Sequence, residues 1–120
     1  MTGDQALAEL LDVSEDVVAA VIFDLEGNPV AASVGDEEAR RAAEIAAAML
    51  AHADALRTGA SAARLEAVTA DGNVYVVREA AGAIVAATER DAVAGLVYHD
   101  LRATLRKLGR RTREKANAAS

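Results

Sequence analysis

The chain has 120 residues, enough for one domain, and 52% of them are hydrophobic, although 31 are alanines that each bury little area. It contains no cysteine, which excludes disulfides, thiolate metal ligands and cysteine nucleophiles. The net charge of −6 divides into −12 for residues 1–101 and +6 for residues 102–120. Because an acidic body repels nucleic acid and anionic lipid, we expect neither partner, and only the basic end could bind either weakly.

The first third of the chain is predicted to form a helix and then a β-hairpin. Thr2 and Gln5 have the spacing of a capping box, ahead of a helix with a leucine-rich face. Strands are predicted over 17–24 and 29–34, joined by the turn "LEGN". Residues 17–23 are all apolar, so this strand must be covered on both faces and should be central in its sheet.

A second helix is predicted from about residue 36 to residue 57, with acidic residues at its positive end. It carries two apolar stripes. The larger side chains are predicted to face the sheet: Ala42, Ile45, Met49, His52 and Leu56. The smaller ones are predicted to face a second copy, because small side chains let helix axes approach closely: Ala39, Ala43, Ala46, Leu50 and Ala53. The alternative is an exposed face filled with good helix formers.

Three more strands are predicted over 64–70, 73–79 and 83–88, the first two joined by an Asp-Gly turn. The last of them is nearly all apolar, so it should also be central. A third helix is predicted over about 90–108, with Thr88 and Asp91 at capping spacing and Gly109 as its stop. We therefore expect one domain over 1–108 and a basic, disordered tail over 109–120.

The order helix, two strands, helix, three strands, helix resembles the roadblock/dynein light-chain family. The residues that carry this resemblance are "LAELLDVSEDVVAAVIFDLEGNPVAAS", "AEIAAAML", "TADGNVYVVREAAGAIVAAT" and "DAVAGLVYHDLRATLRKL". Asp24 and Gly27 match the family's Asp-x-x-Gly pattern. The resemblance implies a bacterial roadblock-like (profilin-like) α/β domain. With the two apolar strands central, the five-stranded antiparallel sheet should run second, first, fifth, fourth, third, the second helix covering one face and the other two helices the opposite face.

The resemblance also implies a homodimer, in which the third strands share one sheet and the second helices lie side by side. The strand over 64–70 suits this role, because apolar and polar side chains alternate along it and an open strand edge invites pairing. The predicted dimer interface comprises Ala39, Ala43, Ala46, Leu50, Leu65, Ala67 and Thr69.

The chain has few residues in patterns that serve catalysis. His52 is a lone histidine on a helical stripe, and His99 and Asp100, adjacent in a helix, point about 100° apart. No cluster has the spacing of metal ligands, and no glycine-rich phosphate loop occurs. We predict no catalytic residue, no metal site and no cofactor, and hence a protein that is not an enzyme.

Two classes of function follow from the resemblance. The first is a homodimeric regulator of a small Ras-like GTPase, either an activating protein or an effector-type partner. The second is a structural scaffold or adaptor subunit of a larger complex. Arg40, Arg41 and Arg57 are the candidate contacts with a GTPase, and we expect the protein to be cytoplasmic. An adaptor that acts through the basic tail is a third alternative.

Overall fold

The computed structural model describes residues 2–56, 63–80 and 82–119, with the backbone alone described for 110–119. Within these ranges, three helices and five strands follow one another in the order α1 (Gly3–Val13), β1 (Val17–Phe23), β2 (Pro29–Ala32), α2 (Asp36–Leu56), β3 (Arg64–Val68), β4 (Asn73–Glu79), β5 (Gly82–Thr88) and α3 (Ala94–Ala119). This order matches the one that the sequence predicts.

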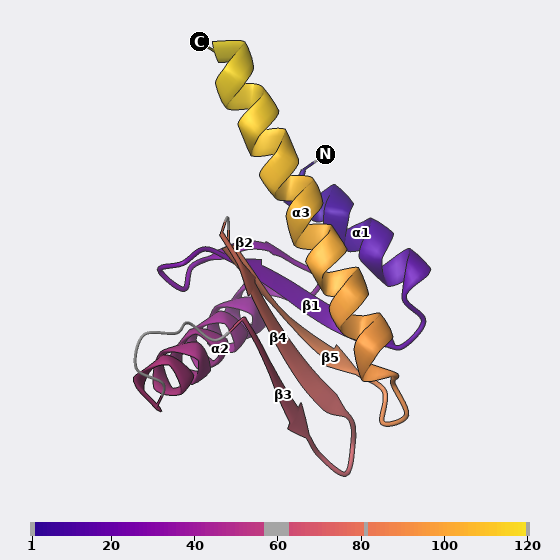
Figure 1. Cartoon of the computed structure of the whole chain (residues 1–120). Coiled ribbons are helices and arrows are strands. Elements are labelled where there is room, and N and C mark those ends of the chain that lie inside the picture. Colours follow the sequence, from indigo (N-terminus) through magenta and orange to yellow (C-terminus); the bar gives the residue numbers. More distant parts are fainter. Residues whose placement is uncertain (1, 57–62, 81, 120) are drawn as a thin grey trace.

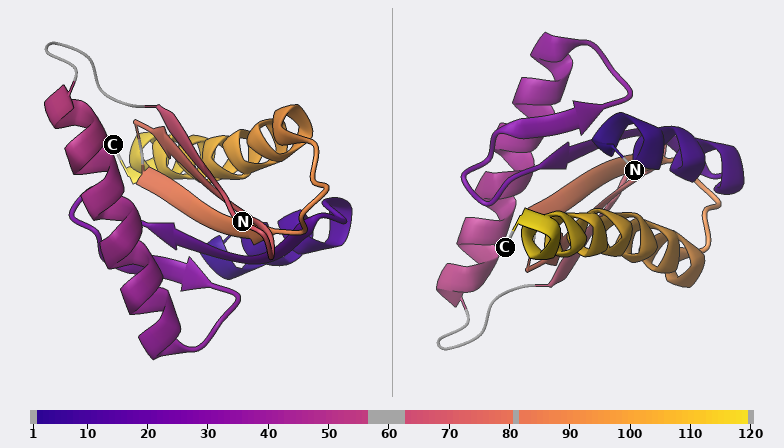
Figure 2. Two further views of the ribbon diagram at one scale, coloured as in Figure 1. Left: turned by 90° about the horizontal axis from the view of Figure 1, so that it is seen from below. Right: turned by 90° about the horizontal axis from the view of Figure 1, so that it is seen from above.

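The strands form one sheet in the order β2-β1-β5-β4-β3, with every neighbouring pair antiparallel. β1 and β5 lie inside the sheet, as expected for strands that are apolar on both faces. The helix α2 covers one face, and α1 and α3 lie together on the other (Figures 1 and 2). The predicted fold class and strand order are confirmed.

Short polar motifs begin and connect the first elements. The Thr2 hydroxyl accepts from the Gln5 amide at 3.2 Å, and the Gln5 side chain accepts from the Thr2 amide at 2.8 Å, so the capping box is confirmed. In the β1–β2 turn, the Asp24 carboxylate accepts from the amides of Asn28 at 2.8 Å and Glu26 at 3.1 Å. Gly27 takes a φ of 88°, which favours glycine. The Asp-x-x-Gly pattern therefore builds a turn.

Each face of the sheet has its own hydrophobic core. On one face, Leu101 of α3 and Leu10 of α1 pack over Ile84 and other strand residues. The Tyr75 and Tyr98 rings meet edge to face there, with centroids 5.2 Å apart. On the other face, α2 packs over Val21, Phe23, Val76, Ala83 and Val85.

The face that α2 buries differs from the prediction. Ala39, Ala43, Ala46 and Leu50 are 0–4% exposed and pack on the sheet of their own chain, so they are not available to a second copy. Ile45 is instead 59% exposed and Leu56 is 87% exposed. The sheet already presents branched valines on this face, and alanines let the α2 axis approach them closely. The prediction assigned the two stripes the wrong way round.

The bounds of α3 also differ from the prediction. The helix begins at Ala94, and Thr88 ends β5 instead of capping α3, its hydroxyl donating to the Glu89 carbonyl at 3.1 Å. It continues through Gly109 to Ala119 and projects beyond the sheet (Figure 1). The predicted stop at Gly109 is wrong because one glycine costs a helix only about 1 kcal/mol, and strong helix formers follow it. The domain boundary at residue 108 stays a prediction.

Candidate functional site

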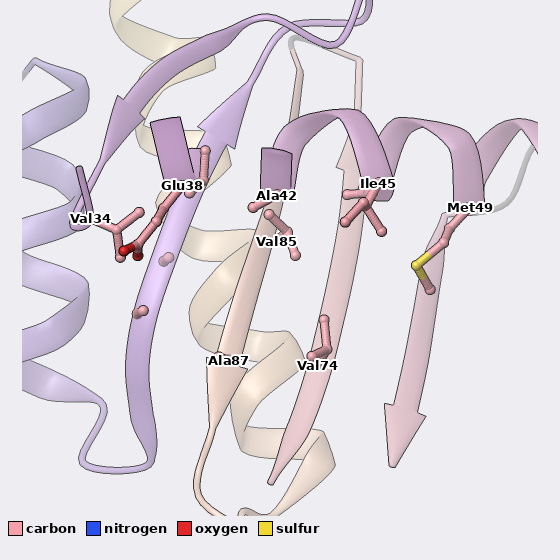
Figure 3. A pocket seen from close by; sticks show the side chains of 12 residues that line it. Val34, Glu38, Ala42, Ile45, Met49, Val74, Val85 and Ala87 are labelled. Atoms are coloured by element: carbon pink, nitrogen blue, oxygen red, sulfur yellow. The ribbon is translucent and has the colours of Figure 1, made fainter. Parts of the chain in front are cut away.

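An apolar groove of about 280 Å³ lies between α2 and the sheet (Figure 3). It exists because α2 packs mainly against β1, β2 and β5, which leaves part of the β4 and β5 surface uncovered. Ala42, Ile45 and Met49 of α2 form one side of the groove. Val74, Val85 and Ala87 form the sheet surface beside them. These side chains come from three separate segments of the chain.

The groove suits burial of apolar side chains better than chemistry. Glu38, near Val34 at one end, is the one ionisable residue that lines it. Its described lining residues include no histidine, serine, threonine or lysine, so the Glu38 carboxylate has no second catalytic side chain beside it there. The groove can bind the apolar surface of a partner, and each Å² of apolar surface that is buried stabilises the complex by about 25 cal/mol.

The strand β3 lies at the edge of the sheet, beside the uncovered surface. Within the described part of the chain it pairs with β4 alone, in a register that sets Leu65 opposite Val76 and Ala67 opposite Val74. Leu65 packs with the core on the α2 face, and Val68 is 72% exposed. An edge of this kind can pair with another strand.

The predicted interface residues on this strand have different roles. Leu65 and Ala67 are half-buried on the α2 side of the sheet, continuous with the groove. Thr69 instead closes the β3–β4 turn, where its hydroxyl accepts from the Gly72 amide at 3.1 Å. Whether a second copy contacts these three residues stays a prediction.

The candidate arginines do not converge on one site. Arg40 forms an exposed ion pair with Glu44 at 3.3 Å, one helical turn away. Arg41 is exposed on the same helix. Arg57 lies outside the described residues. The two described arginines therefore belong to the solvent-facing side of α2.

The two histidines lie in different layers of the fold. His52 is exposed on α2, and His99 is exposed on α3, in the layer on the other side of the sheet. Over residues 2–56, 63–80 and 82–119, no group of three or more His, Asp and Glu side chains is placed to hold a metal ion. In the same ranges, no helix is long and apolar enough to cross a membrane.

The groove is the feature that the sequence analysis missed. Its signal was present, because α2 carries two apolar stripes and one face of one sheet can bury only one of them. Ile45 and Met49 were recognised as a stripe but were assigned to the interior. The uncovered strand positions, Val74 and Ala87, follow from where α2 crosses the sheet, which periodicity does not determine.

Comparisons with known proteins agree on the fold. No protein-family model matches this sequence, and no curated protein matches it. A Roadblock/LC7 domain from Streptomyces avermitilis superposes with a TM-score of 0.82 at 12% identity, covering 93% of this chain and 98% of that one. Myxococcus xanthus MglB gives 0.78 at 12% identity, covering 93% and 88%. Acanthamoeba castellanii profilin IA gives 0.54 at 17% identity, covering 96% and 99%. The chain has the roadblock fold, as its sequence resemblance implied.

Proposed function

We propose that this protein is a homodimeric, non-enzymatic regulator of a small Ras-like GTPase. The observation that supports the proposal is the apolar groove beside the exposed stripe of α2, continuous with the open edge of β3, on a roadblock fold. A surface of this kind costs free energy while it faces water, so a protein partner that covers it gains stability.

A second copy of the chain is the partner we propose for this surface. Two β3 edges can pair across a twofold axis and extend the sheet, which places two grooves on the same face of the dimer. Ile45 and Met49 would then be covered by the other protomer, replacing the alanine stripe that the sequence suggested. Self-association is supported by a similar solved structure, "MglB with tetrameric arrangement", which has a TM-score of 0.71 at 21% identity.

The GTPase follows from the family resemblance and not from a site in this chain. An activating protein can insert an arginine finger, which contributes about 10³–10⁵ in rate. Arg40 is unsuited to that role because it lies within a helix and pairs with Glu44. We therefore propose an indirect mechanism, in which the dimer binds one switch conformation of the GTPase more tightly than the other and so shifts its population.

The test begins by identifying the GTPase, by pull-down from the source cell under GDP-loaded and GTP-loaded conditions. Nucleotide hydrolysis by the purified GTPase is then measured with wild-type protein, with Arg57→Ala and with the dimer-breaking variant Ile45→Glu. We expect Arg57→Ala to retain most of the effect on hydrolysis, and Ile45→Glu to lose it because the dimer is lost.

Two outcomes would change the proposal. If Arg57→Ala abolished the stimulation of hydrolysis while GTPase binding persisted, the protein would supply a catalytic arginine and the indirect mechanism would be wrong. If no GTPase bound in either nucleotide state, a scaffold subunit of a larger complex would take the place of the regulator.

A further inference from the structure

A second hollow, of about 300 Å³, lies on the opposite face of the sheet from the groove, between β3 and α3. Its lining residues are Arg64, Gly95, Tyr98, His99, Arg102, Ala103, Arg106 and Lys107. Every charged side chain among them is basic, although the chain as a whole carries a net charge of −6. The fold thus gathers positive charge from two distant segments, one a strand at the sheet edge and the other a helix.

Aromatic contacts hold one wall of this basic hollow in place. The Arg64 guanidinium lies over the Tyr98 ring, 4.9 Å from its centroid. The Tyr98 ring is in turn fixed edge to face against the buried Tyr75 ring. Arg64 is therefore positioned before any ligand arrives, which reduces the entropy that binding would cost.

The other wall is formed by two arginines one helical turn apart. The Nε atoms of Arg102 and Arg106 each lie 3.5 Å from the same oxygen of Glu79. A guanidinium has five N–H donors, so each arginine can donate to a further carboxylate besides that of Glu79. Lys107 is paired with Glu9.

We propose that the basic hollow binds an acidic segment of a partner protein in an extended conformation. Arg102 and Arg106 are separated by about 6 Å along the helix axis, since an α-helix rises 1.5 Å per residue. Alternate side chains of an extended peptide are separated by about 6.6 Å, so two acidic residues with one residue between them match the two guanidinium groups. Arg64 on the opposite wall can engage the peptide from its other side.

The shape of the hollow favours a peptide over other anions. Arg102 and Arg106 lie one helical turn apart on one wall and Arg64 lies on the other, so an extended segment with several carboxylates can contact all three, whereas a single phosphate is too small to do so. A long polyanion such as nucleic acid would extend beyond the hollow, where residues 1–101 carry a net charge of −12. A short acidic segment is long enough to contact both walls and short enough to stay within the hollow.

The proposal does not depend on the dimer or on the GTPase. The groove and the apolar side of β3 lie on the α2 face of the sheet, whereas Arg64 and α3 belong to the opposite face. A monomer would keep the basic hollow intact.

The test measures fluorescence polarisation of a labelled seven-residue peptide of alternating serine and glutamate, with the same peptide carrying glutamine as its control. Arg106→Gln should weaken peptide binding about threefold. The double variant, Arg102→Gln and Arg106→Gln together, should weaken it about tenfold, because each exposed ion pair contributes about threefold. Arg90→Gln removes a charge that, like Arg106, is exposed but does not line the hollow, and it should leave binding unchanged. Glu79→Gln removes the internal competitor, so it should tighten binding about threefold, a gain that a misfolded protein would not show.

Several results would overturn the proposal. They are equal binding of the glutamine peptide, equal losses in Arg106→Gln and Arg90→Gln, and wild-type binding in the double variant. Competition by inorganic phosphate or single-stranded DNA that exceeds competition by unlabelled acidic peptide at the same charge concentration would identify a general anion site or a nucleic-acid site instead.

Discussion

Ile45→Glu separates the role of the exposed α2 stripe from that of the buried one. Ile45 is 59% exposed in the protomer and lines the apolar groove. If a second copy covers it, each protomer loses roughly 100 Å² of apolar surface to the contact, which stabilises the dimer by about 2.5 kcal/mol at 25 cal/mol per Å². Because the twofold axis places Ile45 of both protomers in the interface, the two contacts together stabilise the dimer by about 5 kcal/mol. Losing both should raise the dissociation constant of the dimer several thousand-fold in the variant.

The assay is sedimentation velocity over a wide range of protein concentration, with thermal unfolding by circular dichroism to verify the fold. Val30→Glu is the matched control, because Val30 is 60% exposed on β2, at the opposite edge of the sheet from β3. We expect Ile45→Glu to be a folded monomer and Val30→Glu to dimerise like the wild type.

Three results would refute the reasoning. A wild-type protein that stays monomeric throughout the range would remove the dimer itself. A folded Ile45→Glu protein that dimerises with wild-type affinity would show that the groove is not the interface. Equal weakening by Ile45→Glu and Val30→Glu would point to a general effect of added negative charge.

Three further predictions concern the folded protomer. Ala46→Glu should lower the free energy of unfolding in urea by about 3–5 kcal/mol, since Ala46 is 1% exposed and a carboxylate there would be buried without a partner. An unchanged urea midpoint would mean that α2 does not bury its alanine stripe. Amide hydrogen bonds, first that from Asn28, lower the pKa of Asp24, so its stabilisation is present above the unfolded value of 3.8 and is lost as pH falls through the lower folded value. The stability difference between wild type and Asp24→Ala should accordingly shrink in acid, and a constant difference would contradict this. Burial raises the pKa of Tyr75 and Tyr98, so absorbance titration should show both side chains ionising above pH 10, and their contribution to stability should be lost as pH rises through the folded pKa values. Ionisation of both at the ordinary tyrosine pKa would contradict this.

Much of the fold could be read from local pattern. The uninterrupted apolar runs of β1 and β5 require cover on both faces, and this requirement alone places them inside the sheet. The capping box at Thr2 and the turn at Asp24 depend on residues within four positions of each other, so sequence spacing is sufficient to predict them. The resemblance to roadblock proteins rested on the same elements.

The candidate sites depended on tertiary structure. Periodicity shows that α2 has two apolar stripes about 100° apart, but which stripe meets the sheet depends on how closely the helix axis approaches a layer of branched side chains. The size of Ile45 by itself favours burial, yet the alanine stripe is the one buried against the sheet and Ile45 is 59% exposed. The basic hollow unites Arg64 with Arg102 and Arg106 for a similar reason, since the two segments meet only after β3 has joined the sheet and α3 has packed across it. Sequence spacing determines neighbours along one element, and packing between elements determines which surfaces remain for a partner.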